Sequence, residues 1–166
     1  IRLQRLNQIK TENKEKMENL AKGHGTYREI TQDEFLPEVT GSSKVVVHFY
    51  HSQFKRCKIM DMHLERLALL HIECKFLKIN AEKAPFFVEK LSIKVLPSVN
   101  IFIDGINVAE IKGFEGLNES QKTGYEDEWP TRNLAKLLAS KKVINVKKSE
   151  IEENETINKS SRIREG

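Results

Sequence analysis

Hydrophobic and polar residues repeat with two different periods along this chain, and the change of period separates helices from strands. Apolar residues recur at three- and four-residue steps from Leu3 to Leu20, which predicts an amphipathic helix. Asn13 interrupts the repeat, so the apolar stripe is narrow. Gly23 and Gly25 then predict the end of the helix. A helix this polar buries little surface alone, so we expect it to pack on a domain or to meet a partner.

Residues 26–144 carry the mixture of patterns that is typical of an α/β domain. Thr31 with Glu34 three residues later predicts a capping box at a helix start, and Asp104-Gly105 predicts a hairpin turn. Alternation and β-branched runs predict strands, whereas three- and four-residue apolar spacing predicts helices. The predicted order is β-α-β-α-β-α-β-β-α. We expect strands at 26–30, 44–50, 75–80, 99–103 and 107–111, and helices at 33–39, 57–71, 84–91 and 131–140.

The apolar positions also predict which sides of these elements are buried. The strand at 44–50 is apolar on both faces, as expected for the centre of a sheet that helices cover on both sides. In two of the predicted helices, helical spacing marks a single buried stripe. These stripes comprise Met60, Leu64, Leu67 and Leu70 in the first helix, and Leu134, Leu137 and Leu138 in the second.

The length of 166 residues allows one domain of ordinary size with extensions. After Ile144 the composition shifts to Lys, Ser, Glu and Asn, and so few apolar residues cannot offset the entropy of ordering. No apolar run approaches the roughly 18 residues that cross a bilayer. We therefore predict an amphipathic helical extension at 1–25, the α/β domain at 26–144 and a disordered charged tail at 145–166.

The net charge of +4 is concentrated at one end of the chain. Residues 1–28 hold seven Lys and Arg residues against three Glu residues, so they carry the whole excess. This excess suits either an acidic partner surface or a solvated helix face. Binding of nucleic acid is not expected, because Glu12, Glu15 and Glu18 interrupt the positive face and no aromatic residues accompany it.

The cysteine content points to a reducing compartment. The chain has two cysteines, Cys57 and Cys74, which are too few to staple a domain of this size. Its first residues, IRLQRLNQIK, lack the apolar core of a secretory signal. We therefore expect a cytoplasmic protein. A disulfide between the two cysteines is not expected, because they lie at opposite ends of one predicted helix.

The stretch FYHSQFKRCK, residues 49–58, places Cys57 at the start of a helix that follows an apolar strand. Together with the order of elements and the Val-Leu-Pro before the next strand, this stretch resembles the thioredoxin fold. The resemblance implies a three-layer sandwich with a central mixed sheet. It sets Phe54 at the attacking cysteine of the thioredoxin motif, Lys55 and Arg56 at its Gly-Pro, and Cys57 at its second cysteine. Pro97 falls at the cis-proline.

Longer blocks identify the chain as a member of the phosducin-like family. This resemblance implies a cytosolic helper that binds the chaperonin containing TCP-1 and modulates the folding of tubulin and actin. It implies no cofactor, and some members of the family bind G-protein βγ subunits. The blocks are KGHGTYREI at 22–30, HFY at 48–50, FKRCKIMD at 54–61 and FLKINAEKAPF at 76–86.

The motif limits the chemistry that Cys57 can support. A dithiol reductase needs an attacking thiol and a resolving thiol, and Phe54 occupies the attacking position, so dithiol turnover is not expected. Cys57 remains a candidate lone thiol. If it lies near the surface, Lys55, Arg56 and Lys58 would favour its thiolate and allow thiol–disulfide exchange. If it lies beneath the helix, it is a small apolar core residue.

Three further residues each have two interpretations. His48 stands at the place of a buried thioredoxin carboxylate, and is either a proton partner for Cys57 or a core histidine. The turn at Pro97 is either a protein-docking surface or an inherited stable turn. Trp129 is either an exposed anchor for a partner or a residue packed across the start of the last helix.

We expect no metal site, because the candidate ligands His63, His71, Glu73 and Cys74 lack a tight ligand spacing. The sequence and its resemblance together predict a non-catalytic co-chaperone of thioredoxin fold that regulates chaperonin-assisted folding of tubulin and actin. The alternative is a thioredoxin-like redox protein that uses Cys57 alone.

Overall fold

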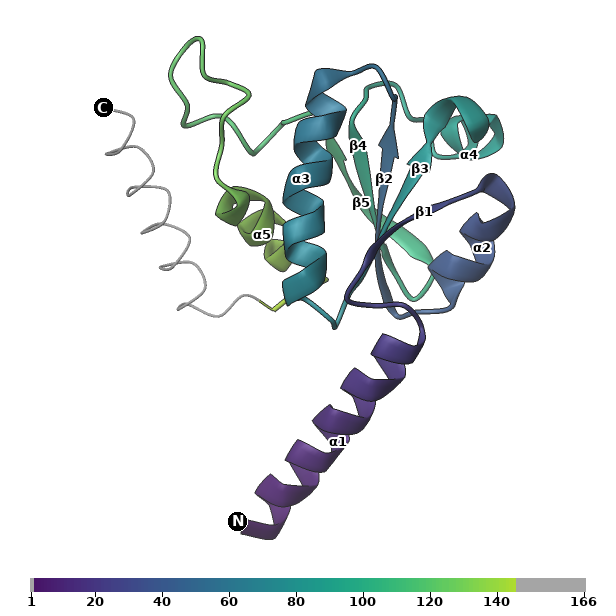
Figure 1. The fold of residues 1–166 in the computed structure, drawn as a ribbon, viewed down its shortest axis with the longest axis vertical. Helices are drawn as coiled ribbons and strands as arrows, with labels where there is room; N and C mark the ends of the chain where they lie inside the picture. The colour runs from purple at the N-terminus through teal and green to yellow at the C-terminus, as the bar shows by residue number, and fades with distance from the viewer. Residues whose placement is uncertain (1, 146–166) are drawn as a thin grey trace.

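A five-stranded mixed sheet forms the centre of the structure, a computed structural model that describes residues 2–145 (Figure 1). The order across the sheet is β1-β3-β2-β4-β5. β1 and β2 each pair with β3 in parallel, whereas β4 runs antiparallel to both β2 and β5. The strands are β1 (Tyr27–Ile30), β2 (Lys44–Tyr50), β3 (Lys75–Asn80), β4 (Ser98–Ile103) and β5 (Ile106–Lys112).

Helices cover both faces of this sheet, which confirms the predicted three-layer α/β fold (Figure 1). α3 and α5 lie on one face, and α2 and α4 lie on the other. The central strand β2 supplies both layers, because successive side chains point to opposite faces. The helices are α1 (Arg2–Ala21), α2 (Gln32–Thr40), α3 (Lys55–Leu70), α4 (Pro85–Lys90) and α5 (Thr131–Ser140), with a short 3-10 turn at Ala81–Lys83.

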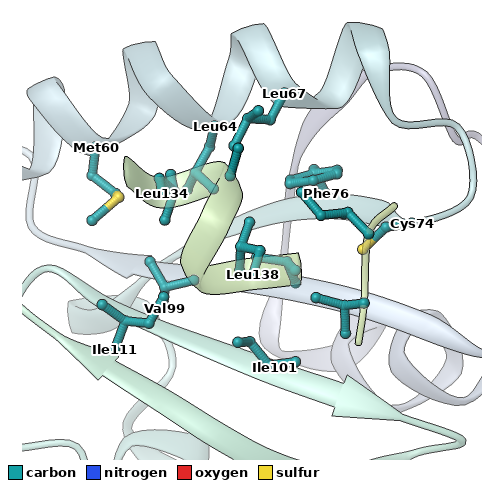
Figure 2. Packing of buried hydrophobic residues seen from close by; sticks show 14 of the residues in the cluster. Met60, Leu64, Leu67, Cys74, Phe76, Val99, Ile101, Ile111, Leu134 and Leu138 are labelled. Atoms are coloured by element: carbon teal, nitrogen blue, oxygen red, sulfur yellow. The ribbon is translucent and has the colours of Figure 1, made fainter. Parts of the chain in front are cut away.

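The larger hydrophobic cluster lies between α3, α5 and the sheet (Figure 2). Met60, Leu64 and Leu67 are buried there as predicted, and so are Leu134 and Leu138 of α5. The prediction was wrong for Leu70, which is 60% exposed. Leu70 lies about 80° around the helix from Met60, at the edge of the buried face. Leu137 is partly buried against the same cluster, so it lies at the margin of its stripe.

Aromatic rings fill the opposite layer. Phe35 of α2 packs on Phe87 of α4, with 4.0 Å between the ring centroids. The ring of Phe35 also contacts Phe49 of β2 and Phe102 of β4, at centroid distances of 5.9 and 5.7 Å. Tilted and edge-on arrangements of this kind are the favoured geometry for aromatic pairs. One ring therefore ties both covering helices to the two central strands.

The predicted helix start and hairpin turn are both present. The Glu34 carboxylate accepts hydrogen bonds from the N–H and the hydroxyl of Thr31, at 3.2 and 3.1 Å, and closes the capping box of α2. Asp104 and Gly105 have positive φ angles of 52° and 79° and join β4 to β5. Two consecutive left-handed residues match the twist of a tight hairpin, which explains the Asp-Gly pair.

α1 extends away from the sheet and its covering helices (Figure 1). None of its residues is buried, and its apolar stripe is exposed to solvent. The predicted helix is therefore present, and none of its described residues is buried by the domain. The stripe comprises Leu3, Leu6, Ile9, Met17 and Leu20.

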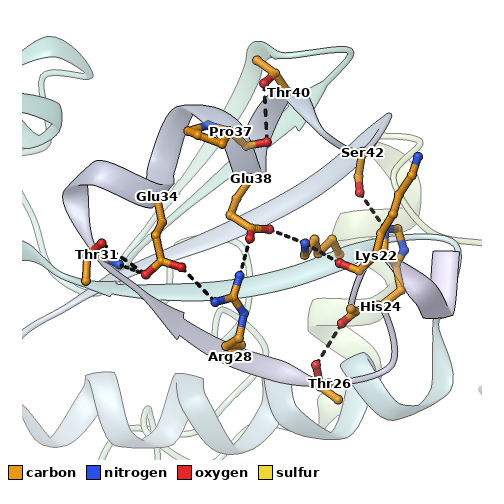
Figure 3. Close-up of polar contacts among 12 residues, drawn as sticks. Lys22, His24, Thr26, Arg28, Thr31, Glu34, Pro37, Glu38, Thr40 and Ser42 are labelled. Carbon is orange, nitrogen blue, oxygen red and sulfur yellow. Dashed lines mark hydrogen bonds and ion pairs between the residues drawn. The ribbon is translucent and has the colours of Figure 1, made fainter.

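A polar network holds the segment that follows α1 against the domain (Figure 3). The Nδ1 of buried His24 donates to the carbonyl of Ile72 at 2.6 Å, and its Nε2 accepts from the hydroxyl of Ser42 at 2.8 Å. The ammonium of Lys75 donates to the carbonyl of Lys22 at 2.6 Å and pairs with Glu38. The exit of α1 is thus fixed to α2 and β3 by buried hydrogen bonds.

Within residues 2–145, no helix is long and apolar enough to cross a membrane. The predicted disordered tail at 145–166 lies, apart from Asn145, outside the described residues.

Candidate functional site at the start of helix α3

The motif loop, residues 51–54, leads from β2 into α3, and its most prominent side chain is Phe54. Phe54 is the N-cap residue of α3 and is 46% exposed. Its ring stacks on the imidazole of His51, with 4.3 Å between centroids and 20° between planes. His51 in turn pairs with Glu82. An exposed aromatic ring therefore occupies the position that the resemblance sets against the attacking thiol of the thioredoxin motif.

Cys57 lies beneath this loop, in the first turn of α3, and is only 1% exposed. Its Sγ accepts a hydrogen bond from the N–H of His51 at 3.5 Å. Burial raises the pKa of the Cys57 thiol, and this effect outweighs the hydrogen bond, which acts in the opposite direction. Lys55 and Arg56 are exposed, whereas the Cys57 thiol is buried. The surface position that a thiolate would need is therefore absent at Cys57. The geometry favours the core interpretation of Cys57 over the exchange thiol.

The Pro97 turn lies at the same edge of the sheet as the motif loop. The Leu96–Pro97 peptide bond is cis. Phe49, which begins the motif stretch, pairs with Ser98, the residue after Pro97. The carbonyl of Pro97 accepts from the N–H of Gly113 at 2.7 Å, and the neighbouring Val95 is 47% exposed. The motif loop and this turn therefore form one continuous end of the molecule.

His48 is fully buried in β2, and its partners differ from the predicted one. Its Nδ1 lies 3.0 Å from Oδ1 of Asp61 and 2.9 Å from the hydroxyl of Tyr27. The Tyr27 hydroxyl also donates to Asp61 Oδ1, at 2.6 Å. Because the carboxylate accepts, the proton of the neutral imidazole resides on Nδ1. The structure thus places His48 in a Tyr27–His48–Asp61 cluster. The hydrogen-bond donor to the sulfur of Cys57 is instead the N–H of His51.

Burial and hydrogen bonding together set the charges of this cluster. Burial lowers the pKa of His48, in spite of the hydrogen bond to Asp61, so the imidazole is neutral. Burial alone would raise the pKa of the Asp61 carboxyl, but hydrogen bonds from His48 and Tyr27 hold it below its ordinary value. Burial and the neighbouring Asp61 raise the pKa of Tyr27 well above its ordinary value. The Asp61 carboxylate therefore accepts hydrogen bonds from two neutral donors, His48 and Tyr27.

Sequence reasoning missed Asp61, although a signal existed. Asp61 follows Cys57 by four residues, so a helix places both on one side. In the structure, the Asp61 carboxylate lies next to buried His48 on the adjacent strand and orients its imidazole. Lys78 of β3 completes the surroundings, with its ammonium 3.9 Å from Asp61 Oδ2.

A groove of about 700 Å³, here named the α3 groove, lies beside the motif. One wall is the outer side of α3 and the other is the segment 124–131 before and at the start of α5. Arg56 spans the two walls through an ion pair with Asp127 at 2.9 Å. The lining residues on the α3 side are Lys55, Arg56, Ile59, Met62, His63 and Arg66.

Trp129 lies in the far wall of the α3 groove and is 4% exposed. Its indole stacks on the imidazole of His63, with 3.9 Å between centroids, and meets Phe114 edge-on at 5.2 Å. The interpretation as an exposed anchor was therefore wrong for Trp129, because His63 and Phe114 cover its ring. Tyr125 is the exposed aromatic residue of this segment.

No cluster of metal-binding side chains occurs among residues 2–145. The Nδ1 of His63 is engaged at 2.7 Å by the hydroxyl of Thr131, and His71 pairs with Glu73. Cys74 is buried, and its burial strongly raises the pKa of its thiol. These side chains have structural partners and do not converge on a common point.

Comparison with known proteins places this chain in a family. The thioredoxin family model matches residues 26–123. Phosducin-like protein 3 of Dictyostelium discoideum is 54% identical over 115 residues, which cover 69% of this chain and 62% of that protein. Thioredoxin domain-containing protein 9 of Mus musculus is 44% identical over 142 residues, which cover 85% of this chain and 60% of that protein.

Solved structures agree on the fold. A mutant thioredoxin of Halobacterium salinarum superimposes with a TM-score of 0.58 at 18% identity, covering 75% of this chain and 96% of that one. The chain spans 49% to 62% of the length of the first curated relatives that it matches. With its thioredoxin fold, its modified motif and these relatives, the chain belongs to the phosducin-like family, in the group of phosducin-like protein 3 and thioredoxin domain-containing protein 9.

Proposed function

We propose that this chain acts as a cytoplasmic co-chaperone, without redox turnover, that binds the chaperonin containing TCP-1 and modulates the folding of tubulin and actin. The observation that carries the proposal is the motif itself. Phe54 presents an exposed ring in place of an attacking thiol, and Cys57 is buried. A family member that lacks the reactive group and keeps the fold around it is suited to binding rather than to catalysis.

Two exposed apolar surfaces support a docking role. The first is the stripe on α1, and the second is the sheet end that carries Phe54 and Val95. Exposed aromatic and aliphatic side chains of this size are favourable contacts once a partner removes them from water. The basic residues of α1 would assist the approach to an acidic surface. Docking through both surfaces would hold the domain at a defined angle to the chaperonin.

Co-purification from cytosol tests the proposal. The full-length tagged protein should recover subunits of the chaperonin at low salt. The Leu6→Ser/Ile9→Ser variant removes part of the α1 stripe and should lower recovery by about tenfold or more, the equivalent of about 1.4 kcal/mol. The control variant Gln4→Ser/Asn7→Ser changes neighbouring exposed polar residues and should behave like the unaltered protein. Failure of the unaltered protein to recover chaperonin subunits would refute the proposal.

The same experiment examines other partners. Tubulin and actin in the recovered fraction would identify the clients that accompany the chaperonin. G-protein βγ subunits, which other members of the family bind, are measured in the same fraction. Their recovery without the chaperonin would instead indicate a protein that binds G-protein βγ subunits.

An insulin-reduction assay addresses the redox alternative. The unaltered protein and Cys57→Ser should both reduce insulin at the background rate, because the attacking position holds Phe54 and the remaining sulfur is buried. A rate above background that the substitution abolishes would instead establish Cys57 as an exchange thiol.

A further inference from the structure

Residues 22–26 join α1 to the domain, and α1 ends within them in a Schellman motif. The N–H of His24 donates to the carbonyl of Asn19 at 3.0 Å. The N–H of Gly23 donates to the carbonyl of Leu20 at 3.1 Å, and Gly23 has the left-handed φ of 97° that this motif requires. Because the side chain of His24 is buried, this residue belongs both to the end of the helix and to the interior of the domain.

Three hydrogen bonds from this segment reach separate parts of the domain (Figure 3). Both ring nitrogens of His24 are engaged, by the carbonyl of Ile72 and the hydroxyl of Ser42. Burial lowers the pKa of His24, so the imidazole is neutral and supplies the one donor and one acceptor that these partners need. Lys75 binds the carbonyl of Lys22, one of the carbonyls at the end of α1. The last turn of α1 is therefore attached directly to the domain.

The side of α1 that faces the domain is polar. A cleft of about 480 Å³ separates it from residues 70–73 and Asn145. At about 100° per residue, Leu6 and Met17 of the apolar stripe lie about 120° and 140° around the helix from Glu12, which lines the cleft. Much of the stripe is therefore turned away from the domain. The cleft residues of α1 are Glu12, Asn13, Glu15, Lys16 and Asn19.

We propose that His24 and Lys75 hold α1 as a rigid arm, with one direction and one rotation relative to the domain, and so present its apolar stripe outward to the chaperonin. A helix on a flexible linker samples many orientations, and a partner that binds it must remove that freedom at a cost in affinity. The arm has lost this freedom before the partner arrives. The rigidity of α1 rests on the contacts at its exit, whereas its benefit for docking rests on the proposed function.

Distances between two spin labels on the whole 166-residue chain test the rigidity. Gln8→Cys places one nitroxide on α1, and Glu65→Cys places the other on α3, both at exposed positions. The native Cys57 and Cys74 are buried and stay unlabelled in the folded protein. Double electron–electron resonance should give one narrow distance distribution. A variant with Gly-Ser-Gly-Ser inserted after Lys22 is the reference for a flexible linker and should give a broad distribution.

Substitutions at the exit of α1 show which contacts hold the arm. His24→Ala removes both ring hydrogen bonds and should broaden the distribution toward that of the insertion variant. Ser42→Ala removes only the hydroxyl donor to Nε2 and should give an intermediate width. Lys22→Ala is the matched control, because it shortens an exposed side chain but keeps the backbone carbonyl that Lys75 binds.

The ¹⁵N spectrum of each variant shows whether the domain is folded. Should His24→Ala fail to fold, the width for Ser42→Ala decides the question. A distribution in the unaltered protein as broad as that of the insertion variant would overturn the proposal. A width that stays narrow in every folded variant of His24 and Ser42 would also overturn it.

Recovery of chaperonin subunits from cytosol tests the benefit for docking. The insertion variant should recover them about threefold less well than the unaltered protein, because the freed helix must lose its orientation on binding. Lys22→Ala should match the unaltered protein. Equal recovery by the insertion variant would overturn the positioning role of His24 while the proposed function stands. If the unaltered protein recovers no chaperonin, the proposed function fails instead, and the distance distributions still decide whether α1 is rigid.

Discussion

His63 places an ionisable ring inside the folded domain and thereby couples the stability of the protein to pH. Its imidazole is stacked on Trp129 and bonded to Thr131. Burial, assisted by the positive charge of Arg66, lowers the pKa of His63 from 6.5 to about 4. Between these two values the unfolded chain binds a proton that the folded chain does not bind. Acid therefore favours unfolding over this range.

His63→Phe tests this coupling, because it keeps an aromatic ring against Trp129 and removes the titration. In the unaltered protein, His63 should account for a loss of about 3 kcal/mol in the free energy of unfolding as the pH falls from 6.5 to 4. The variant should lose correspondingly less over the same interval. Urea unfolding at several pH values measures both slopes, and identical slopes would show that His63 does not titrate as its burial implies.

At the scale of elements, the contact between α2, β3 and the exit of α1 depends on one buried ammonium. Lys75 stands at the start of β3 with its side chain 7% exposed, and Glu38 of α2 supplies its counter-charge. Glu38 also pairs with Arg28 of β1 (Figure 3). An ion pair that is largely withdrawn from water costs much when one partner is removed, because the other charge remains buried.

Glu38→Gln should therefore destabilise the protein by about 2 kcal/mol, since the ammonium of Lys75 loses its carboxylate inside the network. Asp127→Asn breaks an ion pair with Arg56 whose side chains are 48% and 33% exposed, and should cost less than about 1 kcal/mol. Urea unfolding of the two variants provides the comparison. Equal losses would mean that burial of Lys75 adds nothing to the pair.

At the scale of the whole molecule, α1 contributes no buried side chain to the core of the domain. α1 has no buried residue, whereas α5 contributes Leu134 and Leu138 to the main core. The domain therefore gains little from α1, and α1 is free to serve a partner. This division is consistent with the docking role proposed for α1 above.

Removal of residues 1–21 should change the free energy of unfolding by less than about 1 kcal/mol, because no core contact is lost. Truncation after Pro130 should instead abolish cooperative unfolding, because it deletes α5 and its buried leucines. Circular dichroism during thermal unfolding distinguishes the two. A large loss of stability on removal of α1 would show that α1 packs on the domain in solution.

Local rules were enough to predict most elements of this fold. Three local patterns predicted structure over a few residues, and the structure confirmed all three predictions. They are the capping box at Thr31, the Asp104-Gly105 turn and the apolar residues on both faces of β2. The stripe on α3 was predicted well at Met60 and failed at Leu70, because periodicity marks the centre of a buried face more sharply than its edge.

The candidate site depended more on tertiary contacts. The replacement of an attacking thiol by Phe54 is visible in the sequence, because it is a statement about residue identity. The burial of Cys57, the link of His48 to Asp61 and Tyr27, and the covering of Trp129 by His63 join residues from different elements. Such contacts have no local signature, since they arise only when strands and helices pack.

The sequence by itself determined the α/β class, the amphipathic character of α1 and the loss of the dithiol motif, because each follows from residue type and short-range spacing. Only the tertiary structure decided that Cys57 is a core residue, that Lys75 is buried against Glu38, and that a groove lies between α3 and residues 124–131. The physical reason is that burial and charge pairing depend on neighbours that are distant along the chain, and packing alone brings those neighbours together.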